Sequence, residues 1–295
     1  MLRRELAYGW TAYDAGDFLC LDRVVAPVLA ALPVHATDGR ADAGERPFAA
    51  AAVRSDALAL ASAVAGVFGD TDLAWRAADR ALTAAGGSGD AAVMAHAAHR
   101  STVAMIAHEG EAAAAEFAAE ADANLAEAAG RRGAAGRAAL RTLRLGAALA
   151  TARLGDSAAT RDLLDAAERV DPGAAHVGLH RVAAHVLLGD YPRAIAGRMT
   201  PAALAVLPRG RQARHLLDIA RALSGVGRRG EAVLTLLDAE AAAAQEIRCR
   251  PARRRFVEDL LRLDASADGD DARLRALASR CLINGSGPDD RVSIM

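Results

Sequence analysis

The chain has 295 residues, of which 53% are apolar but only 3% aromatic, and its formal net charge is −1. All 36 basic residues are arginine, which excludes a P-loop lysine, a kinase ATP-site lysine and a pyridoxal Schiff base. The near-zero net charge means that the chain as a whole lacks the positive charge typical of nucleic-acid-binding proteins. Three distant cysteines without a CxxC motif indicate a reducing compartment.

Alanine-rich segments separated by glycine turns predict an all-α protein. Alanine is the best helix former, and the β-branched and aromatic residues that strands favour are sparse. Two short helices are predicted within 3–32, followed by a polar connector over 33–54. A helix over 55–68 is next, with Ser55 or Asp56 placed to cap it. The remaining predicted helices are 71–85, 91–108, 111–129, 134–154, 157–170, 174–188, 190–199, 209–225, 229–246, 251–263 and 272–282.

One spacing recurs along these helices: a turn glycine, a small residue five positions later, and an alanine seven positions further. The three copies are Gly69-Ala74-Ala81, Gly155-Thr160-Ala167 and Gly227-Ala232-Ala239, and Pro201 cuts short a fourth copy that starts at Gly189. The glycine ends one helix, and the small residues let the next helix pack closely. The spacing therefore predicts a tetratricopeptide-like (TPR-like) helical-repeat solenoid, an α-α superhelix.

The repeats predict one domain over residues 1–283. Residues 1–54 would form capping helices and the connector, 55–246 the helix-pair repeats, and 247–283 the C-terminal capping helices. Residues 284–295 would form a flexible tail. Uncharged stretches stay below the ~20 residues of a membrane span, and the N-terminus lacks a signal-peptide apolar region. We therefore expect a soluble, cytoplasmic protein with no membrane partner.

Candidate catalytic and metal-binding motifs are incomplete. His96 and His99, and likewise His176 and His180, share helix faces, but zinc needs three or four ligands and neither pair carries the glutamate of H-E-x-x-H. There is no G-x-S-x-G motif, and the glycine-rich stretch 86–89 lies between helices without a preceding strand. The sequence predicts no catalytic residue, no metal site and no cofactor.

Arginine clusters are the strongest candidates for recognition. Residues 193–295 contain 18 arginines and 13 acidic residues, which gives them a net charge of +5. Residues 1–192 therefore carry a net charge of −6. The clusters comprise Arg209, Arg211 and Arg214; Arg228 and Arg229; and Arg248, Arg250, Arg253, Arg254 and Arg255 around Pro251. They form either a solvated face in a lysine-free chain or a site for an acidic peptide, a phosphate-bearing metabolite or a nucleic-acid backbone.

Several runs carry a resemblance to a known family. They are Ala7-Tyr-Gly-Trp-Thr-Ala-Tyr-Asp-Ala-Gly, Asp72-Leu-Ala-Trp-Arg-Ala-Ala-Asp-Arg-Ala, His180-Arg-Val-Ala-Ala-His-Val-Leu-Leu-Gly-Asp, Arg211-Gln-Ala-Arg-His-Leu-Leu-Asp-Ile-Ala-Arg-Ala, Gly230-Glu-Ala-Val and Ile247-Arg-Cys-Arg-Pro. From about residue 4 to about residue 282, the chain resembles the C-terminal TPR-like region of actinobacterial XRE-type helix-turn-helix transcriptional regulators.

The sequence departs from this family in two places. Members usually carry a DNA-binding helix-turn-helix domain before the region, whereas this chain starts where that domain would end. Before His180 the family typically holds an aromatic-Gly-Pro-x-Asn stretch, and this chain has Asp171-Pro-Gly-Ala-Ala-His-Val-Gly-Leu. The resemblance therefore implies the sensing half of a regulator, whose ligand differs from that of its relatives or is absent.

The expected function is a non-catalytic binding module in transcriptional or secondary-metabolism regulation. A peptide, a protein or a small molecule would bind its concave face, and a homodimer is possible. The residues assigned to the partner by resemblance and charge are His180, Arg181, Arg211, Arg214, Arg248 and Arg250. Two alternatives stay open: a DNA-binding regulator whose N-terminal helix-turn-helix is missing from this sequence, and a helical-repeat enzyme or accessory protein of a biosynthetic pathway. Direct DNA binding is not expected without the helix-turn-helix.

Overall fold

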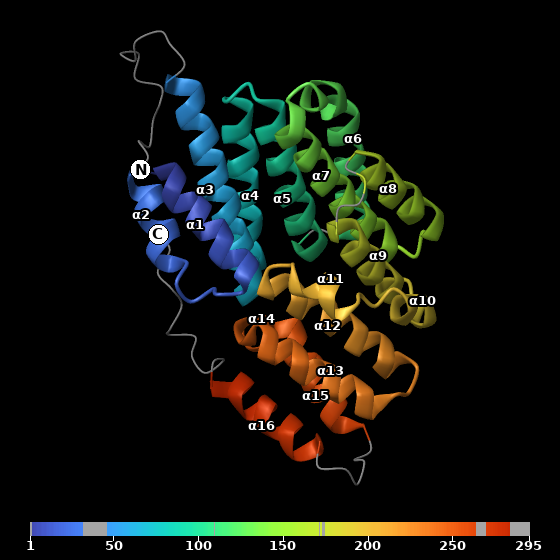
Figure 1. The fold of residues 1–295 in the computed structure, drawn as a ribbon. Helices are drawn as coiled ribbons and strands as arrows, with labels where there is room; N and C mark the ends of the chain where they lie inside the picture. The colour runs from blue at the N-terminus through green and yellow to red at the C-terminus, as the bar shows by residue number, and fades with distance from the viewer. Residues whose placement is uncertain are drawn as a thin grey trace. The chain divides into compact units, whose positions relative to one another are not determined.

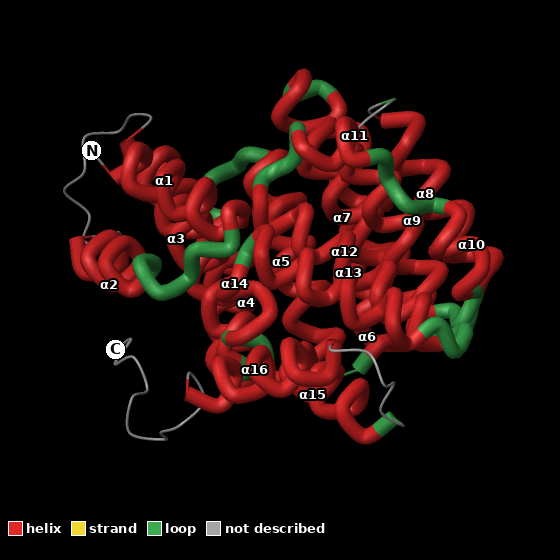
Figure 2. The backbone as a smooth tube through the Cα atoms, turned by 60° about the horizontal axis from the view of Figure 1, so that its bottom comes forward, coloured by secondary structure: helices red, strands yellow, loops and turns green. Residues whose placement is uncertain are grey.

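The computed structural model describes residues 2–31, 46–108, 110–170, 172, 175–263 and 270–283. Within these ranges the chain forms helices joined by turns and loops, with no strand (Figures 1 and 2). The helices are α1 Leu2–Ala15, α2 Asp22–Ala31, α3 Arg46–Phe68, α4 Thr71–Gly86, α5 Ala91–His108, α6 Glu111–Gly130, α7 Gly133–Arg153, α8 Ser157–Val170, α9 Ala175–Leu187, α10 Tyr191–Ala196, α11 Pro201–Ala205, α12 Arg209–Gly225, α13 Arg229–Ala242, α14 Ala244–Arg248, α15 Pro251–Arg262 and α16 Asp270–Ile283. The all-α prediction is confirmed. The predicted tail 284–295 and most of the connector lie outside the described residues.

Helix α3 begins at Arg46, earlier than the predicted start at Ser55. The prediction of a polar connector was therefore wrong for residues 46–54. The alanine run that follows Phe48 continues the helix, so Ser55 and Asp56 lie inside it and do not cap it. The Ser55 hydroxyl donates to the Ala81 carbonyl at 2.9 Å, which ties α3 to α4. The Asp56 carboxylate accepts a hydrogen bond from the indole N–H of Trp10 at 2.7 Å.

The predicted helix over 229–246 is interrupted at Ala243. This residue has φ −152° and ψ 95°, so α13 ends at Ala242 and the short helix α14 follows. The sequence also failed to predict α11, which starts with Pro201 and is capped by the Thr200 hydroxyl accepting from the Ala203 N–H at 3.3 Å.

The repeated glycine spacing marks real turns and close packing. Gly69, Gly155 and Gly227 have φ angles of 83°, 78° and 79°, in the left-handed region that favours glycine. The small residues of all three copies are buried: Ala74, Ala81, Thr160, Ala167, Ala232 and Ala239. The predicted role of this spacing, a turn followed by close helix packing, is confirmed.

A single substitution checks that packing. Ala239→Leu should lower the free energy of unfolding by roughly 1–3 kcal/mol, because Ala239 is fully buried in α13 and extra methylenes overfill a packed core. The same change at the exposed Ala241 of this helix should leave stability nearly unchanged, since alanine and leucine have similar helix propensity. Urea unfolding followed by far-UV circular dichroism measures both. Equal stability of the two variants would contradict close packing at the repeat alanine.

The contacts divide the chain into two compact units. Unit 1 contains Met1–Trp10, Arg23–Gly66 and Asp70–His180, and unit 2 contains Thr11–Asp22, Val67–Gly69 and Arg181–Met295. In unit 1, each helix from α4 to α8 packs against the next, and α5 also packs against α7 (Figure 1). The core between α5, α6 and α7 is built mainly from alanine with a few leucines, which keeps these helices close.

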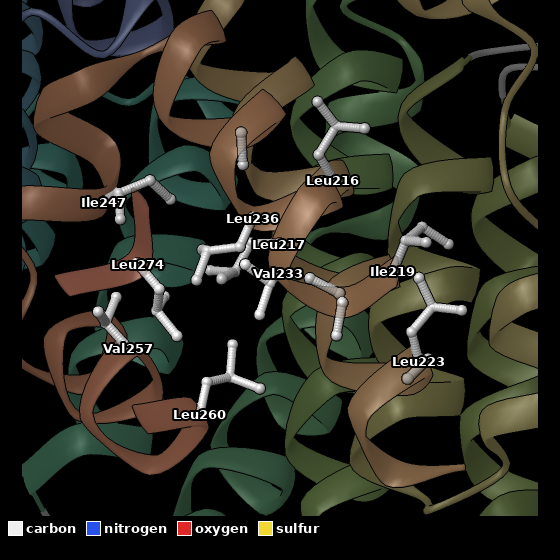
Figure 3. Packing of buried hydrophobic residues seen from close by; sticks show 14 of the residues in the cluster. Leu216, Leu217, Ile219, Leu223, Val233, Leu236, Ile247, Val257, Leu260 and Leu274 are labelled. Carbon is white, nitrogen blue, oxygen red and sulfur yellow. The ribbon is translucent and has the colours of Figure 1, made fainter. Parts of the chain in front are cut away.

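Unit 2 holds a larger apolar core between α12, α13, α14, α15 and α16. Its buried side chains converge from all five helices, as Figure 3 shows for Leu217, Leu236, Ile247, Leu260 and Leu274. This core fixes the backbone of α12 and α14, which carry several of the arginines singled out in the sequence.

Helix α3 meets the length and composition of a membrane span over Phe48–Phe68. However, 56% of its most apolar stretch is buried within the protein, and the helix contains Arg54 and Asp56. Core helices of soluble proteins have the same properties, so α3 is consistent with the expected soluble protein.

Candidate functional site

Two of the predicted partner-binding arginines converge on one buried carboxylate in unit 2. The Glu246 side chain in α14 is 0% exposed. The Arg214 Nε donates to its Oε1 at 2.6 Å, and the Arg250 Nε donates to its Oε2 at 2.9 Å. Arg253 forms a third ion pair with Glu246 and also donates to its backbone carbonyl at 2.9 Å. These four residues are called the Glu246 cluster below.

The Glu246 cluster stays ionised at neutral pH. Burial raises the pKa of Glu246, but the charges of Arg253, Arg214 and Arg250 outweigh it and hold that pKa far below its usual range. Burial lowers the pKa of Arg253 to about 9, against the opposing effect of Glu246, so Arg253 remains a cation at neutral pH. Three guanidiniums therefore surround one carboxylate.

Two aromatic rings from the N-terminal part of the chain lie against the surplus positive charge. The guanidinium carbon of Arg214 lies 5.1 Å from the ring centre of Tyr13, and that of Arg250 lies 5.3 Å from the ring centre of Phe18. Both rings are buried. The electron-rich ring faces attract the cations, which helps to stabilise the cluster.

The segment 11–22 is held against α12 and α14 by further polar contacts within unit 2. Arg211 forms an ion pair with Asp14 at 3.0 Å. The Gln245 Oε1 accepts hydrogen bonds from the Phe18 and Leu19 backbone N–H groups at 2.6 and 2.9 Å. The predicted site arginines Arg211, Arg214 and Arg250 therefore anchor residues of the same chain.

Arg248 pairs with a second buried carboxylate, that of Glu240. Its Nε donates to the Glu240 Oε1 at 2.8 Å, and Arg280 binds the same carboxylate at 2.8 Å. Burial raises the pKa of Glu240, but the hydrogen bonds from Arg280 and Arg248 outweigh it and lower that pKa. Much of the positive charge of the C-terminal third is thus neutralised inside the protein.

The remaining two predicted residues, His180 and Arg181, lie next to each other in α9 and belong to neither cluster. The His180 Nδ1 lies 2.7 Å from the His176 carbonyl oxygen, one helical turn earlier, and Arg181 is half-buried. The six predicted residues therefore fall into four local groups: Arg214 and Arg250 at Glu246, Arg211 at Asp14, Arg248 at Glu240, and the neighbours His180 and Arg181.

Unit 1 contains a polar group that the sequence did not predict as a site. Trp10 of α1 donates to Asp56 of α3 and meets the ring of His96 in α5 edge-on, with ring centres 5.3 Å apart. His99 and Arg100 follow His96 in α5 at spacings of three and four residues, so they share one side of that helix. These five residues, from three alternate helices, are called the inner-helix cluster below.

The inner-helix cluster is closely packed and partly neutral. Burial lowers the pKa of His96, and the charge of Arg100 lowers it further, while Asp56 opposes both effects. His96 is therefore neutral at neutral pH, and its Nε2 atom is buried with no hydrogen-bond partner in the described residues. A Cβ atom on Gly146 of α7 would lie 2.9 Å from the His99 Nδ1, so this glycine lets α7 approach α5.

The cluster provides hydrogen-bond donors, acceptors and aromatic faces, which suit recognition of a polar ligand. Within the part of the chain that the structure describes, no three His, Cys, Asp or Glu side chains could hold a metal ion. The sequence signal was the i, i+3, i+4 spacing of His96, His99 and Arg100 in an otherwise apolar helix. That spacing indicates a polar side of α5, but only the tertiary fold brings Trp10 and Asp56 next to this side.

Asp56→Asn tests the electrostatics of the cluster. The change removes the charge that raises the pKa of His96, so that pKa should fall further, while the asparagine oxygen can still accept from the Trp10 indole N–H. NMR titration of the His96 ring protons measures the shift. Asp79→Asn, at an exposed position of α4, should leave the His96 titration unchanged. An equal effect of both substitutions would contradict the proximity of Asp56 and His96.

Comparison with known protein families finds none that matches this chain, and a search of curated proteins also finds no match. The resemblance to XRE-type regulators therefore stays a prediction, and the site rests on the geometry of the described residues.

Proposed function

We propose that this chain is a non-catalytic, TPR-like binding module that captures a peptide segment of a partner protein and acts in regulation. The observation that carries this proposal is the packing of α5 against α7 in unit 1, although α6 separates them in sequence. In helical-repeat solenoids, alternate helices contact each other and line one continuous face, which is used for binding. The repeated glycine and alanine spacing supports the same architecture.

The inner-helix cluster supports the choice of this face. Its residues come from α1, α3 and α5, and Gly146 of α7 adjoins His99. An extended peptide has backbone N–H and C=O groups along its whole length, and polar side chains on alternate helices can pair with them. The partner site is therefore proposed in unit 1, on the side of the inner-helix cluster.

The arginines assigned from the sequence have a different role in this proposal. Arg211, Arg214, Arg248 and Arg250 each pair with a carboxylate of unit 2, so they stabilise the module and do not hold an acidic partner. Regulation of transcription or of secondary metabolism, and a cytoplasmic location, follow from the resemblance and remain parts of the proposal.

A peptide selection with a matched pair of variants tests the proposal. A random-peptide display library is selected on the intact chain, and the enriched peptide is measured by fluorescence anisotropy. His99→Leu should weaken its binding at least fivefold, since interface residues that matter typically cost more than 1 kcal/mol when replaced. His108→Leu, at the exposed end of the same helix, should change binding less than twofold. A failure to enrich any saturable binder, or equal affinities of the two variants, would overturn the proposal.

A further inference from the structure

A cavity lies between α15 and α16 in unit 2. It has a volume of about 380 Å³ and is lined by Pro251, Arg254, Arg255, Val257, Glu258, Ala278 and Cys281. Pro251, Val257, Ala278 and Cys281 give it apolar walls, and the two arginines place positive charge at its edge. None of the lining residues belongs to the Glu246 cluster.

Arg254 differs from the other arginines around it. Arg248, Arg250, Arg253 and Arg280 all pair with a buried glutamate. Arg254 is half-buried but pairs with no carboxylate among the described residues. A guanidinium that is partly removed from water costs free energy unless an anion compensates it.

The other ionisable groups in and near the cavity do not supply that anion. Cys249 and Cys281 lie within electrostatic range of Arg254, but burial raises the pKa of both thiols, that of Cys281 to about 11, so both are neutral at neutral pH. The Glu258 carboxylate is engaged at 3.7 Å by Arg262, on the exposed side of α15. The positive charge of Arg254 therefore remains available to a ligand.

We infer that this cavity is a binding site for a small aliphatic monocarboxylate, whose carboxylate meets Arg254 and Arg255 and whose chain lies against Val257 and Ala278. Arginine presents two parallel N–H groups that match a carboxylate. Glu258 also lines the cavity, and its carboxylate repels a phosphate dianion more strongly than a monoanion, which favours a monoanion. The apolar walls favour a hydrocarbon chain over a purely polar ion.

Titration of the intact chain with sodium hexanoate, followed by isothermal calorimetry and by NMR, tests this site. Hexanoate should bind saturably and at least tenfold more tightly than 1-hexanol, because a charge-assisted hydrogen bond is worth about 1.5–3 kcal/mol. Inorganic phosphate should bind more weakly than hexanoate. An absence of saturable hexanoate binding would overturn the inference, and so would tighter binding of phosphate.

Three variants locate the site. Arg254→Gln should weaken hexanoate binding about tenfold or more, whereas Arg275→Gln, at an exposed position of α16 outside the cavity, should change it less than twofold. Ala278→Leu fills the cavity without changing any charge and should abolish binding, with circular dichroism confirming the helical content. Binding that survives both Arg254→Gln and Ala278→Leu would place the ligand elsewhere and overturn the inference.

Discussion

Glu246→Gln is expected to lower the free energy of unfolding of unit 2 by about 3–5 kcal/mol. The substitution keeps the shape of the side chain but removes the carboxylate that pairs with all three arginines of the Glu246 cluster. Arg214, Arg250 and Arg253 would then face one another as like charges, and Arg253 is 12% exposed in its side chain. An uncompensated charge in such surroundings costs far more than a lost surface ion pair.

Hydrogen exchange of the backbone amides in α12 and α14, read by mass spectrometry, measures this loss locally. The matched control is Glu231→Gln in α13, which removes the carboxylate of an exposed pair with Arg228. That variant should exchange like the wild type, because solvent screens exposed ion pairs. If both variants exchange alike, the Glu246 cluster does not stabilise unit 2 in the way described.

The second large effect is a loss of stability in mild acid, caused by His215 in α12. This side chain is 2% exposed, and its Nε2 accepts a hydrogen bond from the Met199 N–H at 3.0 Å. Burial, together with the charge of Arg198, lowers the pKa of His215 to about 4 from its ordinary value of 6.5. Between these two pH values the unfolded chain binds a proton that the folded chain does not, so stability falls as the pH is lowered.

His215 should account for a fall of about 3 kcal/mol in the free energy of unfolding between pH 6.5 and pH 4, with its full stabilisation present above pH 6.5. His215→Gln can still accept from Met199 but does not titrate, so the pH dependence of this variant should be flatter by that amount. Urea unfolding at a series of pH values measures the difference, and NMR gives the His215 pKa directly. A His215 ring that titrates near its ordinary value would contradict the prediction.

The helix pattern could be predicted from the sequence because its signals are local. Gly69, Gly155 and Gly227 need a left-handed backbone, and the alanines that follow them at fixed spacing end up buried. The predicted helix boundaries were wrong where tertiary packing overrides these local sequence signals. Ala243 interrupts a good helix sequence with neither glycine nor proline, and no local residue explains why the chain turns there.

The candidate sites could be predicted only in part, because they depend on contacts between distant residues. Arg250 and Glu246 lie at a spacing of four residues, a pair that a sequence can show. Asp14 and Arg211 are 197 residues apart, and Trp10 and Asp56 are 46 apart, so only the fold brings them together. The arginine-rich composition indicated recognition of an outside anion, and only the fold shows that four of the predicted arginines pair with carboxylates of the same chain.

The anchoring of segment 11–22 also constrains how the protein can be made. Phe18 and Gln245 are 227 residues apart in sequence but share a hydrogen bond, so the partners of this segment leave the ribosome long after it. During synthesis the Tyr13 and Phe18 rings lack their binding partners until α12 and α14 have emerged from the ribosome. Pairings between distant segments are formed late and slowly, because the intervening chain must first be ordered. No single cut of the polypeptide yields two fragments that each contain one complete unit.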